Sequence, residues 1–307
     1  MGFYAPAQIV RDAREHGVAI RPADINHSEW DCTLEPDREN SPALRLGFRQ
    51  IKGLKPDAAE ALLKARKSGN ARPFSSPEDL WLRSNLQPSA LERLAKADSY
   101  GSVGLSRRQA LWEVRRINPG QLPLFAEAGE NIVEPEVTLP TMAPGEEVSH
   151  DYAAIRLSLK HHPLELLRDQ LASEGVIPAA QLAETKSGKP VTVAGLVITR
   201  QRPGTASGVI FATLEDETGI ANVIVWSKLF ERYRKETLAA RLLCVTGELQ
   251  REGIVIHVIA KRLVDITDRL MALMESPQRF KTEVTAADES APLGEGGQVM
   301  YPSRDFH

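Results

Sequence analysis

The sequence has 307 residues, of which 42% are apolar and 26% are charged, a composition that suits two folded domains and excludes a fibrous or globally disordered chain. No run of about 18 apolar residues and no basic start followed by an apolar core occurs, so neither a membrane span nor a secretory signal is expected. The two cysteines, Cys32 and Cys244, form no C-x-x-C pair, which excludes a cysteine-rich zinc site and fits the reducing cytoplasm.

The net charge of −3 is distributed unevenly. Residues 1–118 hold 19 Lys and Arg against 15 Asp and Glu, residues 119–185 hold 3 against 11, and residues 186–269 hold 13 against 9. Two mildly basic blocks separated by an acidic one indicate domain boundaries, and basic blocks suit a polyanionic partner. Basic balances of this size are also common in proteins that bind no nucleic acid, so charge alone does not decide the function.

The first block is predicted to be mainly helical. Residues 18–25 alternate as a strand does, and Pro22 restricts that strand to a sheet edge. Ser76 and Asp79 form a capping box with proline between them, which marks the start of a helix. The further helices are predicted at residues 7–16, 88–97 and 106–116.

Residues 51–59 resemble a helix-hairpin-helix motif. A first helix is expected from Leu44, Gly53 centres a tight turn, and Pro56 opens the second helix. Unpaired backbone N–H groups at such a turn, helped by the helix dipole, hold a phosphate oxygen without reading sequence. An ordinary αα-hairpin that Gly53 merely closes is the alternative. The residues predicted to contact DNA here are Lys52, Gly53, Leu54 and Lys55.

Residues 119–148 change character, with five prolines, six glutamates and no lysine or arginine. Such a composition buries little apolar surface, so this segment is predicted to be an acidic flexible linker. Helical spacing returns in residues 149–185, which we interpret as a helical connector.

The second basic block, residues 186–269, is rich in Val and Ile and predicts a five-stranded OB barrel. Three strands precede a helix at residues 227–238 and two follow it; a small α+β sandwich is the main alternative. Residues 270–307 are expected to form a mostly disordered tail. The predicted fold class is therefore α+β and multidomain. The predicted strands are residues 191–198, 209–214, 221–226, 242–248 and 254–264.

An OB barrel binds single strands through aromatic and basic side chains on one face. Arg200 and Arg202 lie at a strand end, where a loop at the barrel rim is expected. Phe211 and Trp226 suit base stacking, although each could equally be a core residue, which is the commoner place for such a side chain. His257 is a further candidate. The residues predicted to bind DNA in this block are Arg200, Arg202, Phe211 and Trp226.

Catalytic signatures are sparse. No D-x-D pair occurs, so the usual carboxylates of a two-metal site are not visible. The acidic run Glu215–Glu217 is better explained as a solvated hairpin turn than as a metal site. We therefore predict no catalytic residue, no metal ligand and no cofactor in this chain, and no nucleotidyl-transfer activity by the chain alone.

Four further runs carry a resemblance to a known family, together with the hairpin and the OB-like block. They are Gly2–Val10, Pro22–Ser28, Arg107–Trp112 and Ser303–His307. In this order these features resemble bacterial C-family DNA polymerases, most closely the error-prone branch of the DNA polymerase III alpha-subunit family, and the first two runs are similar to the end of that family's fingers region. The resemblance covers essentially the whole chain.

The resemblance implies a role in damage-induced mutagenesis and translesion DNA synthesis within a multi-protein mutasome. It places the metal-binding carboxylates in an upstream palm domain, with Mg²⁺ expected for the full-length polymerase, so this chain is similar to the C-terminal third only, as a truncated, split or mis-started product would be. Residues 1–42 then correspond to the end of a fingers-like region and residues 43–118 to a DNA-binding hairpin region.

Two alternatives remain open at this point. One is a stand-alone OB-fold adaptor that binds single-stranded nucleic acid. The other is a helix-hairpin-helix glycosylase, against which the five predicted strands and the acidic linker count.

One motif in the linker resembles the Q-L-x-L-F peptide that binds the bacterial sliding clamp. An extended peptide of this kind buries its leucine and phenylalanine in an apolar pocket, while the glutamine fixes the start by hydrogen bonding. The alternative is that these side chains dock on the chain's own helices. The residues predicted to bind the clamp are Gln121, Leu122, Leu124 and Phe125.

Overall fold

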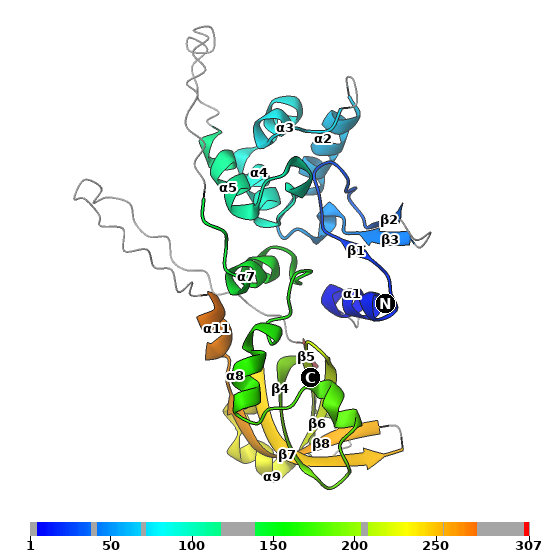
Figure 1. Ribbon diagram of the computed structural model, residues 1–307, viewed down its shortest axis with the longest axis vertical. Helices are drawn as coiled ribbons and strands as arrows, with labels where there is room; N and C mark the ends of the chain where they lie inside the picture. Colours follow the sequence, from blue (N-terminus) through cyan, green and yellow to red (C-terminus); the bar gives the residue numbers. More distant parts are fainter. Residues whose placement is uncertain are drawn as a thin grey trace, which may run out of the picture. The chain divides into compact units, whose positions relative to one another are not determined.

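The computed structural model describes residues 5–37, 42–68, 72–117, 139–203, 208–253 and 255–274, and a short strand at 304–306 (Figure 1). The chain divides into two compact units, which are described separately. Unit 1 comprises residues 1–142 and 150–159, and unit 2 comprises residues 143–149 and 160–307.

Unit 1 is a cluster of short helices with a small sheet beside it (Figure 1). The helices α2, α3, α4 and α5 surround a core in which Phe48, Leu62, Leu91 and Tyr100 are fully buried. Its elements are α1 (Pro6–Glu15), β1 (Ile20–Arg21), β2 (Thr33–Pro36), β3 (Pro42–Arg45), η1 (Phe48–Gln50), α2 (Pro56–Lys67), α3 (Pro77–Ser84), α4 (Pro88–Lys96), η2 (Gly101–Val103) and α5 (Arg107–Arg116).

The capping box predicted at Ser76 is present only in part, because the Asp79 carboxylate accepts from the N–H of Ser75, at 3.1 Å, and does not complete the box at Ser76. Ser76 accepts a hydrogen bond from the N–H of Asp79 at 3.0 Å, and Pro77 is the first residue of α3. Ser106 and Gln109 form a reciprocal capping box at the start of α5. Each of these helices therefore begins where a short local signal satisfies its free N–H groups.

The prediction of a helix before the hairpin is wrong. Residues 42–45 form β3, the central strand of the small sheet, and only residues 48–50 make a short 3₁₀ turn. The N–H of Leu44 donates to Ala19 O at 2.8 Å, so the backbone here is bonded to a neighbouring strand. Non-local pairing has overridden a local pattern that was compatible with a helix.

The linker prediction is wrong at its C-terminal end, because α7 (Pro144–Ile155) begins inside residues 119–148. Pro144 opens this helix, where its missing N–H costs nothing, and Glu146 and Glu147 lie in the first turn, where the helix dipole favours negative charge. Residues 118–138 lie outside the described part of the chain.

Unit 2 contains a closed five-stranded barrel, as predicted. The strands follow the order β5-β6-β8-β7-β4, and an additional β4–β5 pairing closes the ring. The β6–β8 pair is parallel and the other barrel pairs are antiparallel. The strands are β4 (Pro190–Gln201), β5 (Ile210–Asp216), β6 (Gly219–Val225), β7 (Leu242–Glu252) and β8 (Val255–Asp265).

Short helices and one added strand accompany this barrel (Figure 1). Two helices lie between β6 and β7, where the sequence predicts one, and the strand at residues 304–306 pairs in parallel with the end of β4. These elements are η3 (Glu165–Leu167), α8 (Arg168–Ser173), η4 (Ala179–Ala183), α9 (Ser227–Arg232), α10 (Arg234–Ala239), α11 (Asp268–Met274) and β9 (Arg304–Phe306).

The acidic run at residues 215–217 is a β5–β6 turn, but it is not solvated. Asp216 is 2% exposed and accepts hydrogen bonds from the N–H groups of Ala179, Thr218 and Gly219. Arg168 completes the cluster with an ion pair to Glu217, which holds the pKa of this guanidinium above its usual value. The run therefore stabilises this end of the barrel through buried hydrogen bonds and an ion pair.

Candidate nucleic-acid interface

The turn between η1 and α2 is held by two buried side chains. Ile51 is 3% exposed and Leu54 is 7% exposed, and both pack in the core of unit 1. Gly53 lies between them with φ +77°, a left-handed conformation that strains any residue with a Cβ. Leu54 therefore anchors the turn with its side chain, and its N–H donates to Ile51 O at 3.2 Å.

The start of α2 leaves backbone donors open. Lys55 occupies the N-cap position without a side-chain cap, and Pro56 has no N–H. The N–H groups of Gly53, Lys55 and Asp57 have no hydrogen-bond partner among the described residues, whereas that of Lys52 donates to Ala154 O at 2.8 Å. A 12-residue helix with an uncapped N-terminus is suited to hold an anion.

The connection between α4 and α5 is a second hairpin and serves as an internal comparison. Its Gly104 has the same φ of +77° as Gly53. Here the N–H of Ser102 donates to Asp24 Oδ2 at 2.9 Å, and Ser106 caps α5. Because the chain itself satisfies these donors, the first hairpin is the better candidate for a phosphate.

Arg93 completes the first hairpin, although no pattern in the sequence predicted it there. A Cβ built on Gly53 would fall on Nη1 of Arg93, so this guanidinium rests directly over the turn. Arg93 lies on the exposed side of α4, and it has no ion pair with any described residue. The spacing of α4 predicts which of its residues are exposed, but not that this side faces the hairpin.

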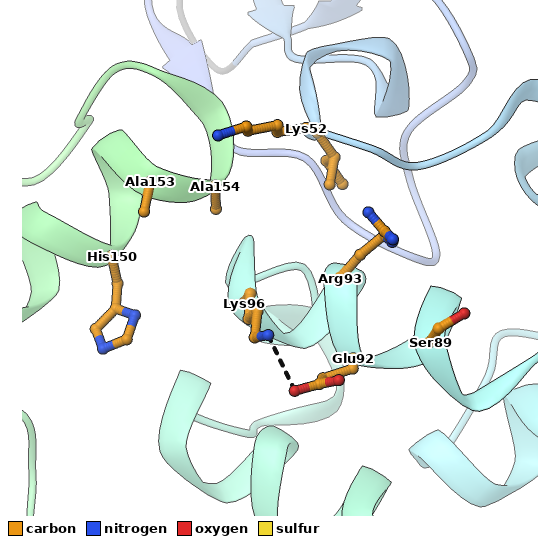
Figure 2. Close-up of a pocket in the computed structure, with 9 residues that line it drawn as sticks. Lys52, Ser89, Glu92, Arg93, Lys96, His150, Ala153 and Ala154 are labelled. Carbon is orange, nitrogen blue, oxygen red and sulfur yellow. Dashed lines mark ion pairs between the residues drawn. The ribbon is translucent and has the colours of Figure 1, made fainter. Parts of the chain in front are cut away.

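A cavity of about 250 Å³ opens beside the turn (Figure 2). Lys52, Arg93 and Lys96 bring three cationic side chains to it, and Glu92 brings one carboxylate, which lies 3.0 Å from Lys96 Nζ. The small side chains of Ala153 and Ala154 on α7 line another side (Figure 2). The region of the hairpin therefore carries surplus positive charge.

The barrel presents an apolar row on its outer surface. Phe211 on β5 is paired with Ile224 on β6, and Ile224 is paired with Ile259 on β8. Phe211 is 36% exposed, and Trp226, just after β6, is 54% exposed. The aromatic pair predicted from sequence thus lies at the surface, where stacking on bases is sterically open.

A polar row runs beside this apolar one. Asn222 on β6 is paired with His257 on β8, whose Nδ1 is buried and has no hydrogen-bond partner among the described residues. Arg202 is exposed, and its guanidinium lies 5.4 Å from the ring centre of Phe230. Strands 2 and 3 of OB barrels and the loop before them are the usual binding surface. Asn222 on β6 and Arg202, just before β5, lie there, whereas His257 lies on the fifth strand of the barrel, beside β6.

Arg200 is not at the surface expected for it. Its side chain is buried and donates to the carbonyl oxygens of Thr237, at 2.6 Å, and Ala240. These carbonyls end α10, and a cation suits the C-terminus of a helix. These hydrogen bonds hold the Arg200 side chain inside the fold, so Arg200 is not part of the proposed interface.

Two family comparisons match the two units. Residues 17–110 match the helix-hairpin-helix motif family, and residues 191–266 match the OB-fold nucleic acid binding domain family. The residues 121–125 of the clamp-like motif lie outside the described part of the chain. Fold and family together define a protein with two nucleic-acid-binding domains.

Over its whole length the chain is homologous to the C-terminal part of error-prone DNA polymerases. It is 50% identical to the error-prone DNA polymerase of Ruegeria pomeroyi over 100% of this chain and 28% of that protein. Error-prone DNA polymerase 1 of Rhizobium meliloti is 49% identical over 91% of this chain and 27% of that protein. The error-prone DNA polymerase of Brucella abortus is 47% identical over 100% of this chain and 28% of that protein. The resemblance found in the sequence is confirmed, and the chain spans little more than a quarter of these relatives.

Two features are absent from the described residues, a membrane-spanning helix and a metal-binding cluster. None of their helices is long and apolar enough to cross a membrane. No group of three or more His, Cys, Asp or Glu side chains is placed to hold a metal ion within the described ranges.

Proposed function

We propose that this chain is the DNA-binding C-terminal portion of an error-prone DNA polymerase that acts in damage-induced mutagenesis and translesion DNA synthesis. The catalytic palm, with its Mg²⁺, belongs to a part of the polymerase outside this sequence. This role places the chain in the cytoplasm. The names of the relatives support the polymerase, and the open hairpin of unit 1 supports the contact with DNA.

One observation carries the DNA-binding role. At the first hairpin, three backbone N–H groups in the turn and the start of α2, which have no partner within the described part of the chain, lie beside the exposed side chains of Lys52, Lys55 and Arg93. Backbone donors and mobile cations contact phosphates and do not read bases, so binding is expected to be independent of sequence.

The barrel supplies a second contact of a different kind. Exposed Phe211 and Trp226 suit the bases of a single strand, and Arg202 suits its phosphates. We therefore assign duplex binding to the hairpin and single-strand binding to the barrel, a division that fits a polymerase holding a primer–template junction and its unpaired template.

The proposed protein partners are the sliding clamp, bound through residues 121–125, and the accessory proteins of a mutasome. The clamp motif lies between the two nucleic-acid-binding domains in the sequence, so one chain can contact both DNA and clamp. The homology over the whole chain favours this reading over a stand-alone OB adaptor.

Salt titration of binding tests the proposal. The purified chain is titrated against one fluorescent duplex and one single strand, each in two unrelated sequences, at 50 and 200 mM salt. We expect affinity to fall roughly 10- to 100-fold over this range and to be the same for both sequences. Equal affinity at the two salt concentrations, or a strong preference for one sequence, contradicts the proposal.

A further inference from the structure

The side chains that line the cavity beside the first hairpin carry more positive than negative charge. Lys52, Arg93 and Lys96 line it with one carboxylate, Glu92, so the lining carries two net positive charges without counting His150. Neither Lys52 nor Arg93 forms an ion pair with another described residue. Like charges gathered in a recess repel one another, and a bound anion relieves that repulsion.

The walls of the cavity come from three parts of unit 1. The hairpin turn contributes Lys52, α4 contributes Arg93 and Lys96, and the end of α7 contributes Ala153 and Ala154 (Figure 2). The hydrogen bond from the Lys52 N–H to Ala154 O joins the hairpin to α7 and closes the cavity on that side. A nucleic-acid strand that enters here is therefore bounded by α7 on one side.

We propose that this cavity binds a terminal phosphate of a nucleic-acid strand, a phosphate monoester, next to the hairpin amides that hold an internal phosphodiester. The inference rests on the proposed function, because it takes the hairpin to bind DNA. A monoester carries between one and two negative charges at neutral pH and has a single covalent connection, whereas a phosphodiester carries one charge and needs two exits. The net charge of the lining and its closed side both suit the monoester.

Arg93 is the central group of this site. Its planar guanidinium matches two phosphate oxygens at once, while Lys52 and Lys96 act as point charges around it. Because Arg93 rests over Gly53, it lies between the hairpin amides and the cavity. Its role at the strand end must therefore be separated by experiment from a role at the internal phosphate.

The experiment compares strand ends on one DNA. The full chain is titrated against a fluorescent duplex of one sequence that carries a 5′-phosphate, a 3′-phosphate or hydroxyls only, at constant salt. We expect one phosphorylated form to bind roughly 10-fold tighter than the hydroxyl form, the size of one added charge-assisted contact. Which end gains affinity identifies the source of the phosphate.

Variants of exposed residues locate the preference. Arg93→Gln and Lys96→Gln are expected to abolish it, whereas Lys64→Gln, which removes an exposed lysine of α2 that does not line the cavity, keeps it. Circular dichroism checks that each variant is folded.

The outcomes separate the two proposals. Equal affinity of the wild-type chain for all three ends overturns the terminal-phosphate site, while salt-dependent binding of the same DNAs upholds the proposed function. An equal loss for all three DNAs in Arg93→Gln assigns Arg93 to the internal phosphate and also overturns the site. If the wild-type chain binds none of the DNAs, the proposed function itself is wrong.

Discussion

Gly53 and Gly104 share a backbone conformation but differ in what surrounds them. Both have φ +77°. The guanidinium of Arg93 covers Gly53, which precedes the uncapped N-terminus of α2, whereas nothing lies within 4 Å of a Cβ built on Gly104. The two glycines therefore allow backbone strain to be separated from phosphate binding.

We predict that Gly53→Asp lowers duplex affinity at least about 10-fold, because the new Cβ displaces the guanidinium of Arg93 and the new carboxylate repels phosphate. Gly104→Asp, with the same strain of about 1 kcal/mol, leaves duplex affinity unchanged. Anisotropy titration measures binding, and urea unfolding checks that both variants lose similar stability. If both glycine variants weaken binding alike, the hairpin amides are not the phosphate site.

Trp226 offers a matched comparison for the barrel. It is 54% exposed, and Trp112 on α5 is 48% exposed, so replacing either removes little core packing. Because stacking of one base on an aromatic ring contributes about 1–3 kcal/mol, Trp226→Ala should weaken single-strand binding roughly 10-fold. Trp112→Ala should not, when both are titrated with the same unlabelled single strand by calorimetry. Unchanged affinity in Trp226→Ala would remove the barrel from the proposed interface.

At the scale of single residues, the sequence left open whether the barrel's aromatic side chains are exposed, and it misplaced one of the two arginines. Phe211 and Trp226 are exposed as stacking requires, whereas Arg200 is buried under the last carbonyls of α10. The position of Arg93 at the hairpin was not predicted, because Gly53, which its guanidinium contacts, is 40 positions away in the sequence. A side chain that serves a helix end or a turn far along the chain leaves no mark in its local spacing.

Among the elements, the small sheet of unit 1 depends on one carboxylate. Glu35 on β2 receives hydrogen bonds from Arg45 at 2.9 and 3.0 Å and from Arg21 at 2.7 Å. These guanidinium groups, Arg45 foremost, lower the pKa of Glu35 from 4.5 to about 2. The ionised form is therefore bound more strongly in the folded state than in the unfolded one.

We predict that Glu35→Gln lowers the free energy of unfolding by roughly 2 kcal/mol at pH 7. Because the folded pKa is depressed, this contribution is complete above about pH 4.5 and is lost as the pH falls toward 2. Urea unfolding of both proteins at pH values from 7 to about 3 should show the difference narrowing. Glu60→Gln, an exposed change on α2, should leave stability nearly unchanged, and a constant gap for Glu35→Gln across this range would contradict the assigned cause.

Elements with local signals were predicted well, and elements made by distant pairing were not. The barrel strands and α1, α3, α4 and α5 follow from spacing, caps and turn residues. The strands β2 and β3 went unpredicted because each is only four residues long and is stabilised by pairing with the other. The early start of α7 was hidden by the acidic, proline-containing composition around it.

On the scale of the whole molecule, the charge pattern follows the division of labour proposed here. The family matches at residues 17–110 and 191–266 fall within the two basic blocks, and the acidic block lies between them. The carboxylates of an acidic segment between two DNA-binding domains are repelled by the DNA phosphates. We therefore expect the acidic segment, which contains residues 121–125, to leave DNA to the flanking blocks and to bind a protein partner instead.

The last prediction concerns that partner. We propose that residues 121–125 bind the sliding clamp as an extended peptide, with Leu124 and Phe125 in an apolar pocket. Two apolar anchors and one glutamine bury little area, so the affinity should be micromolar, about −8 kcal/mol at 1 μM. Leu124→Ala combined with Phe125→Ala should abolish clamp binding in calorimetry and leave DNA affinity untouched, because buried anchors dominate such contacts.

The matched control removes two apolar side chains elsewhere: Leu34→Ala combined with Leu82→Ala, at positions 68% and 67% exposed, should bind the clamp as the wild-type chain does. If the motif binds the clamp and the two domains bind DNA, clamp and DNA should bind to the chain at the same time. The affinity of the duplex-saturated chain for the clamp should then stay within about twofold of the affinity of the DNA-free chain. Equal clamp affinity in the wild-type chain and the Leu124/Phe125 double variant would show that the motif is not the clamp site, and competition between clamp and duplex would show that the two surfaces overlap.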